Sequence, residues 1–180
     1  MKAIFILLVS IGLAGTNTQA QKVYSTKSGK ISFYSNAALE DIEATTSEVE
    51  SKLATANGQV VFTLLIKGFQ FENQLMEDHF NDNYLESSKF PKSDFKGFIT
   101  NIKDINFAKD GLYPAKVKGG LNLHGVTKEI EADGTIEIKS GKVIAKTKFP
   151  IKLKDYNIGG AMVGKKIAET IIVDVNCKYD

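Results

Sequence analysis

Short runs in which apolar and polar residues alternate cover most of this chain. A period of two is typical of β-strands that bury one face. Dipeptides that favour turns punctuate the runs at Ser28-Gly29, Asn57-Gly58, Asp110-Gly111, His124-Gly125, Asp133-Gly134 and Ser140-Gly141. We therefore expect eight or nine strands, depending on whether the first is separate from the second. The expected ranges are 22–26, 29–35, 42–54, 58–69, 93–107, 112–123, 127–139, 142–153 and 168–178.

Each expected strand has one apolar face, as the run Val60, Phe62, Leu64 and Ile66 illustrates. A single apolar face per strand suits either a β-sandwich or a closed barrel. Strands of ten or more residues, the order of a meander and one helix that could cover an end favour the barrel. We therefore predict an all-β fold, an eight-stranded antiparallel barrel with one short helix over one end. Glycines inside the expected strands, Gly97 and Gly119-Gly120, predict sharp bends or a close approach of two backbones.

The segment 72–98 holds the only strong helical pattern. Leu75, Met76, His79, Phe80 and Tyr84 recur with a period of about 3.6 residues, and acidic residues occupy the other side. We expect Asn73 to cap the start of this helix, and Pro91 to close the connection before the next strand. One short helix therefore interrupts a β protein.

Two segments resemble the signatures of the YceI family. They are "LMEDHFNDNYLESSKFPKSDFKGFI", from Leu75, and "VKGGLNLHGVTKEI", at Val117 to Ile130, in the same order and at similar spacing. Weaker strand patterns extend the resemblance over nearly all of residues 21–180. The resemblance implies a lipocalin-like barrel in the periplasm that binds a polyisoprenoid or a related lipid.

The amino end has the pattern of a secretory signal peptide. Lys2 precedes an apolar run from Ala3 to Leu13, and small and polar residues follow up to Ala20. The apolar run is too short to cross a bilayer core, which needs about 20 residues. We expect residues 1–20 to be removed and residues 21–180 to form one periplasmic or secreted domain without a transmembrane anchor.

The composition excludes some partners and leaves others open. The formal net charge is +2, and all 23 basic residues are lysine, so the chain lacks the arginine fork that favours phosphates and guanines. We do not expect nucleic acid to bind. The single cysteine, Cys177, lies in an alternating run and is expected to be a small buried apolar residue. A homodimer is left open.

The residues offer little for catalysis. There are two histidines and one remote cysteine, fewer than a closed zinc site needs, and there is no nucleophile motif or phosphate-binding glycine loop. We expect no metal, no cofactor and no enzyme activity. His79 is expected to form a hydrogen bond from the helix to the barrel rim, and His124 to shape the turn before Gly125. The weaker alternative is a small enzyme that uses one of these histidines.

The main functional hypothesis is a cavity inside the barrel that holds a long apolar lipid, a polyisoprenoid or an isoprenoid quinone. Burial of a tail of some 30 carbons would contribute roughly 9 kcal/mol at about 0.3 kcal/mol per heavy atom. The alternative is a solid core in a protein that acts through surface contacts with another protein. The expected wall residues are Ile31, Phe33, Phe62, Leu64, Ile66, Phe95, Leu121, Leu123 and Phe149. Met76 and Phe80 are expected to close the cavity, and Tyr84, Tyr156 or His79 to meet a polar head group.

Overall fold

The computed structural model describes residues 22–179, and the predicted signal peptide lies outside the described residues. The strands are β1 (Val23–Asn36), β2 (Asp41–Ala54), β3 (Gln59–Leu65), β4 (Gln70–Phe71), β5 (Lys92–Ile99), β6 (Gly111–Leu123), β7 (Val126–Lys139), β8 (Lys142–Lys152) and β9 (Thr170–Tyr179). The helical elements are η1 (Ile66–Gly68), α1 (Gln74–His79), η2 (Phe80–Tyr84), η3 (Ile102–Asp104) and η4 (Leu153–Tyr156).

Eight of these strands form a closed antiparallel barrel, as predicted. Neighbours follow the order β1-β9-β8-β7-β6-β5-β3-β2, and a long β1–β2 ladder closes the ring. The two-residue strand β4 pairs with Ala44 and Thr45 of β2, beyond the region that pairs with β3. Closure leaves no long free strand edge around most of the wall.

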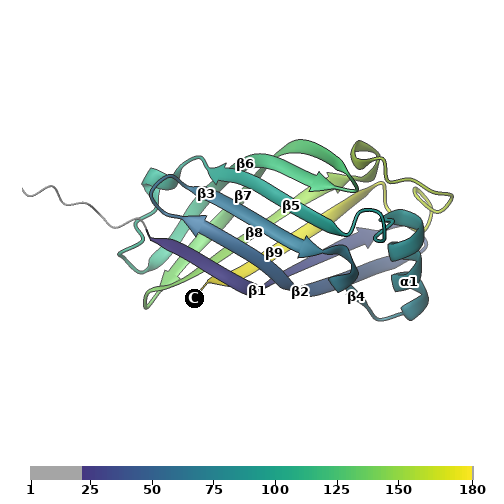
Figure 1. Cartoon of the computed structure of the whole chain (residues 1–180), viewed down its shortest axis with the longest axis horizontal. Helices are drawn as coiled ribbons and strands as arrows, with labels where there is room; N and C mark the ends of the chain where they lie inside the picture. The colour runs from purple at the N-terminus through teal and green to yellow at the C-terminus, as the bar shows by residue number, and fades with distance from the viewer. Residues whose placement is uncertain (1–21, 180) are drawn as a thin grey trace, which may run out of the picture.

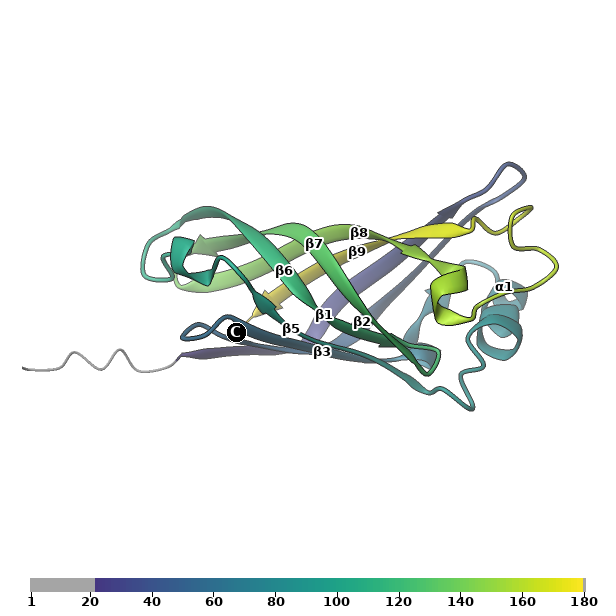
Figure 2. The same cartoon turned by 90° about the horizontal axis from the view of Figure 1, so that it is seen from above.

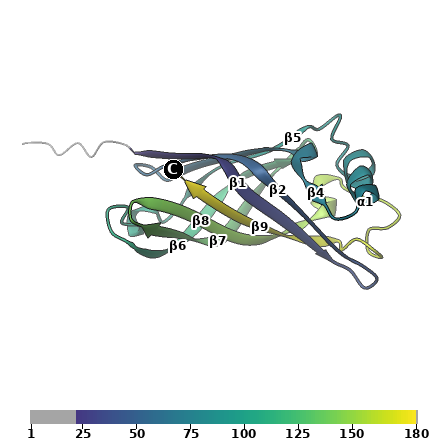
Figure 3. The same cartoon turned by 90° about the horizontal axis from the view of Figure 1, so that it is seen from below.

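The barrel is elongated, and its two ends differ. Helix α1 lies at one end, and the start of β1 and the C-terminus lie at the other (Figure 1). The hairpin that joins β1 to β2 projects past the barrel at the α1 end (Figures 2 and 3). We call the α1 end the mouth and the opposite end the base.

The structure resolves one open strand boundary and corrects another. The ranges 22–26 and 29–35 form one strand, β1, so the first expected strand is not separate. The pairing of β1 with β2 shifts register around Gly29. The expected strand 93–107 ends at Ile99. Beyond that point the side chain of Asn101, in place of the backbone, forms the hydrogen bonds to β6. Its Nδ2 donates to Pro114 O (3.1 Å), and its Oδ1 accepts from Lys116 N (2.8 Å).

Two further predictions concern glycines. Gly97 and Gly119 are cross-strand partners on β5 and β6, and a Cβ at either would collide with the backbone of the other strand. Glycine is therefore required there by the close approach of two backbones, as predicted. The dipeptide Asp133-Gly134 favours a turn, but it lies inside β7, which matches the expected strand 127–139, and Gly134 pairs with Thr147.

The base is closed by packed side chains. Leu53, Val143 and Cys177 are completely buried there, which confirms Cys177 as a small apolar core residue. Burial raises the pKa of the Cys177 thiol to about 12. Tyr179 is also buried, and its hydroxyl donates to Ser51 Oγ (2.8 Å), which in turn donates to Val61 O (2.9 Å).

We predict that Tyr179→Phe lowers the free energy of unfolding by about 1 kcal/mol at neutral pH, because one buried hydrogen bond is lost. Urea denaturation measures this change. The control is Tyr113→Phe, whose exposed hydroxyl donates to Lys109 O, with an expected change below about 0.5 kcal/mol. Equal losses in the two variants would contradict the assignment.

The same hydroxyl predicts a pH dependence. Burial raises the pKa of Tyr179 above its ordinary value of 10.0, so the folded protein holds this proton more tightly than the unfolded chain does. Its contribution to stability is therefore complete below about pH 10 and falls as the pH rises further. The wild type should lose more stability than Tyr179→Phe between neutral pH and pH values above about 10.

Candidate ligand-binding cavity

A cavity of about 520 Å³ runs along the interior of the barrel. Its walls extend from Met76 and Tyr84 at the mouth to Leu53, Ile99 and Tyr179 at the base. A water molecule occupies about 30 Å³ of liquid, so the space is many times larger than one solvent molecule. The interior is hollow, in contrast to the alternative of a solid core.

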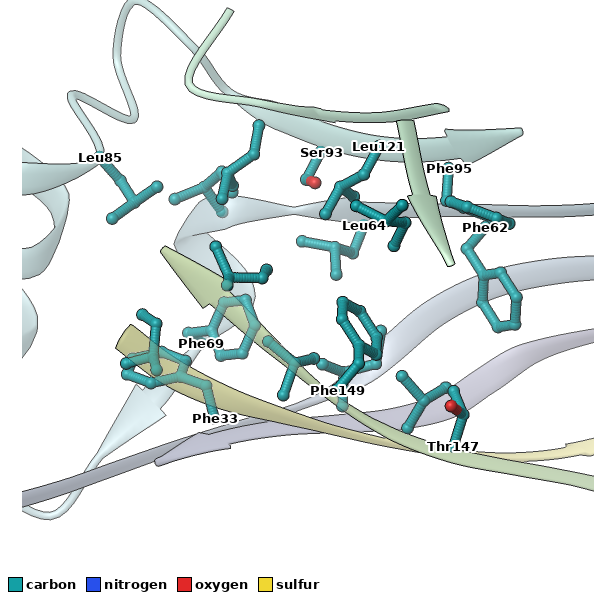
Figure 4. Close-up of a pocket in the computed structure, with 18 of the residues that line it drawn as sticks. Phe33, Phe62, Leu64, Phe69, Leu85, Ser93, Phe95, Leu121, Thr147 and Phe149 are labelled. Atoms are coloured by element: carbon teal, nitrogen blue, oxygen red, sulfur yellow. The ribbon is translucent and has the colours of Figure 1, made fainter. Parts of the chain in front are cut away.

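The inward-facing aromatic residues show the same hollowness. Phe33, Phe62 and Phe149 point into a common space (Figure 4), yet each remains only partly buried. Side chains on the inner face of a filled barrel would touch across the middle and lose nearly all their accessible surface. These three rings instead form a wall around empty space.

Two hydroxyl groups in the wall are already hydrogen-bonded to the protein. Ser93 and Thr147 lie among the wall residues (Figure 4). The hydroxyl of Ser93 donates to Asn122 O (2.7 Å), and that of Thr147 donates to Asp133 O (2.8 Å). An apolar guest would therefore leave neither hydroxyl without a partner, which is the main cost of covering polar groups.

The mouth is covered by a lid, which we define as α1 and η2, residues 74–84. Asn73 caps α1 as predicted, since its side chain accepts hydrogen bonds from Leu75 N and Met76 N. A π-helical turn follows directly. No residue of α1 is fully buried, and Leu75 keeps 61% of its surface exposed. The lid thus rests on the rim and is not part of the packed core.

An aromatic cluster attaches the lid to the barrel. The ring of Phe80 lies 5.5 Å from Phe33 of β1, 5.7 Å from Phe69 and 5.1 Å from Phe71, measured between ring centroids. Such contacts add about 0.5–1.5 kcal/mol per pair beyond the burial itself. Phe80 is therefore the main anchor of the lid.

Phe69 and Phe71 also line the cavity, and sequence reasoning did not include them. The expected strand 58–69 ends at Leu65, and η1 then turns the chain so that β4 begins a new alternation. The two phenylalanines flank Gln70 immediately before the Asn73 cap. This spacing of two was the available signal.

All of the predicted site residues except Tyr156 line this one cavity. They are Ile31, Phe33, Phe62, Leu64, Ile66, Met76, His79, Phe80, Tyr84, Phe95, Leu121, Leu123 and Phe149. Tyr156 does not line the cavity, because its ring is buried in η4. Burial, with a smaller effect of Asp155, raises the pKa of Tyr156 above its usual value.

The two histidines differ from each other in their surroundings. His79 is exposed at the mouth and, within residues 22–179, forms no hydrogen bond to the rim, so that prediction was wrong. His124 does shape its turn, with a φ of 51° before Gly125, as predicted.

The mouth is the polar part of the cavity. Asn73, His79 and Tyr84 line it together with Glu40 and Lys166. The Lys166 ammonium lies 3.7 Å from the Glu40 carboxylate, so the two charges offset each other. Across the described part of the chain, no group of three or more His, Cys, Asp or Glu could hold a metal ion.

Fold and site together define a hollow antiparallel β-barrel with an apolar interior and a helical lid. The sequence model of the YceI-like domain matches residues 18–179, so the chain belongs to the YceI family. A separate comparison with curated proteins gives no match. Within residues 22–179 no helix has both the length and the hydropathy needed to span a bilayer.

Solved structures share the fold. A polyisoprenoid-binding domain from Saccharophagus degradans superposes with a TM-score of 0.76 at 14% identity, covering 89% of this chain and 98% of its own. BcnA from Burkholderia cenocepacia gives 0.69 at 14% identity, with 84% and 96% covered. The YceI protein of Campylobacter jejuni gives 0.53 at 16% identity, with 100% and 99% covered. At such identities the likeness shows the fold alone.

We predict that Phe80→Ala detaches the lid and leaves the barrel intact. Loss of its ring contacts should lower the free energy of opening the lid by about 2 kcal/mol. Amide hydrogen exchange measures this, and the reporter is Leu85 N, which donates to Phe80 O at 2.8 Å. Exchange in β3 and β5 should not change. Leu75→Ala in the same helix is the control, because this side chain is 61% exposed and lies outside the aromatic cluster. An equal effect in both variants would contradict the role of the cluster.

Proposed function

We propose that this protein carries one long apolar lipid chain inside the barrel and acts by binding it, without chemical turnover. The observation that supports this most directly is the cavity, whose inward-facing residues include Phe33, Phe62 and Phe149. Wall hydroxyls that are already hydrogen-bonded suit a hydrocarbon guest, which offers no hydrogen bonds of its own.

The size of the cavity limits the ligand. If each carbon takes about 25–30 Å³, a little less than a water molecule's share of the liquid, about 520 Å³ encloses roughly 17–21 carbons. This corresponds to about four isoprene units. A tail of some 30 carbons would have to extend through the mouth, so the earlier figure of 30 enclosed carbons is too large for this cavity.

A polyisoprenoid or an isoprenoid quinone is the ligand class we favour. Membership of the YceI family and the structural likeness to a polyisoprenoid-binding domain support this choice. The head group would lie at the mouth, near His79 and Tyr84. There, the weak pairing of Lys166 with Glu40 leaves no strong net charge to select a highly charged head group.

A lipid guest would also complete the packing of the interior. Apolar walls without a guest lose the contacts that a filled core provides, and deleted core volume costs about 24 cal/mol per Å³ in small engineered cavities. A bound chain would restore those contacts. If a signal peptide directs export, as the sequence predicts, the protein would carry its lipid in the periplasm or outside the cell.

Native mass spectrometry of protein purified from cells without denaturation tests the proposal. The wild type should carry a co-purifying apolar lipid, or take up added geranylgeraniol once that lipid is removed. Ala145→Phe should abolish this, because Ala145 lines the cavity and a ring there would fill it. Thermal denaturation would confirm that the variant is folded, since overpacking costs about 1–3 kcal/mol.

The matched control is Ile144→Phe, which adds a ring at the neighbouring position of β8, outside the cavity lining. Successive side chains of a strand point to opposite faces, so this variant should keep its lipid. A wild type with neither co-purifying lipid nor uptake of geranylgeraniol would contradict the proposed function.

A further inference from the structure

The barrel wall divides near the mouth, between β7 and β8. These strands pair from Lys139–Lys142 only as far as Gly134–Thr147. From there residues 126–133 of β7 pair with β6, and residues 148–152 of β8 pair with β9. The two strands separate toward the α1 end (Figure 2). We call this division the fork.

One histidine bridges the fork. His124, in the turn between β6 and β7, has its Nδ1 3.0 Å from the carbonyl oxygen of Tyr156 in η4, the element that follows β8. Its Nε2 lies 2.9 Å from Oε2 of Glu86, just after the lid. Only 9% of the His124 side chain is exposed. We call the lid and the residues that follow it up to Ser87 the lid segment. A single imidazole thus joins both sides of the fork to the lid segment.

These contacts require a proton between His124 and Glu86. A carbonyl oxygen can only accept, so Nδ1 must carry a hydrogen. If the carboxylate is ionised, Nε2 must also carry one, and the imidazole is then a cation; otherwise the carboxylic acid donates to Nε2. Removal of that proton would place a nitrogen lone pair against a carboxylate oxygen.

The backbone around the contact is unusual. Glu86 has a φ of 42°, His124 of 51°, and Asn157, next to Tyr156, of 55°. Residues other than glycine rarely adopt this left-handed region, and such positions persist where surrounding contacts enforce them. Three separate segments take up this conformation where they meet at His124.

Phe90 shields the contact. Its ring centroid lies 4.6 Å from that of His124, edge to face. A Cβ at Gly125 would come within 2.5 Å of the Phe90 ring, so glycine is needed for the ring to pack there. Phe90 thus covers the imidazole, whereas 44% of the Glu86 side chain stays exposed to solvent.

We propose that Glu86, His124 and the carbonyl of Tyr156 form a hydrogen-bonded latch that controls the exchange of the lipid with the cavity. This inference rests on the proposed function. The latch holds the lid segment and both sides of the fork together. When its hydrogen bonds break, the fork and the lid open more readily and the lipid leaves faster.

Other charges near the latch are few. The Lys89 ammonium lies 4.0 Å from the second oxygen of Glu86, and both side chains are substantially exposed. The titratable groups of η4 are Lys154, Asp155 and the buried hydroxyl of Tyr156.

Release of retinol into phosphatidylcholine vesicles tests the latch. Retinol is an uncharged, fluorescent isoprenoid alcohol. Release from His124→Asn should be about tenfold or more faster than release from the wild type at the same pH, because the hydrogen bonds that join the lid segment to both sides of the fork are lost.

Two variants test the contact. His124→Asn tolerates the left-handed backbone but removes both imidazole bonds, so release should be fast. Glu86→Gln can donate its amide hydrogen to the imidazole and keep the contact, so release should stay slow, as in the wild type. Glu129→Gln, at an exposed position of β7, is the control and should behave as the wild type. Equal release rates in the wild type and His124→Asn would overturn the proposal.

Hydrogen exchange gives a readout that needs no ligand. Ser87 N donates to Asn81 O (2.8 Å) and Ile158 N donates to Leu153 O (3.1 Å), so these amides report the lid segment and η4. In His124→Asn both should exchange about tenfold faster than in Glu129→Gln. Unchanged exchange would overturn the latch even if retinol binds. Failure of retinol to bind the wild type, together with faster exchange in His124→Asn, would instead count against the proposed function alone.

Discussion

Closure of eight strands around an interior wider than their side chains can fill is the constraint on which this structure depends. The β1–β2 ladder completes the ring, so the apolar faces of all the strands must point at one another. Toward the base the side chains meet, and Leu53, Val143 and Cys177 are completely buried. Farther up, even rings as large as Phe33 and Phe149 do not fill the space. The cavity is therefore a consequence of the barrel's geometry and not of a few special residues.

The two ends of the barrel use different means of closure. The base is a packed core that includes the buried Tyr179–Ser51 hydrogen bond. The mouth relies on elements added to the rim, namely a lid anchored by Phe80 and a fork bridged by His124. Packed cores open only with global unfolding, whereas rim elements with few buried contacts can open locally. This difference places any path for a large guest at the mouth.

The sequence predicted features that depend on local chemistry or on periodicity. Alternation separated Leu64, which lines the cavity, from its exposed neighbour Leu65, and Asn73 was identified as the helix cap from its residue type and position. The YceI signatures are explained in part by the structure, since one contains Glu86 and the other contains His124. Neither signature alone indicates that these side chains meet.

Features that depend on the meeting of distant segments could not be predicted. Tyr156 follows a strand that faces the cavity, yet it lies in η4, where its ring is buried and does not line the cavity. The roles of Phe69 and Phe71 depend on η1, which restarts the alternation after β3. The fork depends on where two strands stop pairing, and their compositions give no sign of that point.

The most direct test of a hollow barrel that encloses a lipid chain is NMR of protein with labelled leucine methyl groups and a spin-labelled stearic acid. The nitroxide on the chain should broaden the methyl signals of Leu64, Leu121 and Leu123, which line the cavity. Leu65 and Leu112 are exposed and should keep sharp signals. Broadening of Leu65 and Leu112 with sharp signals from the interior leucines would show binding on the outer surface and contradict the account.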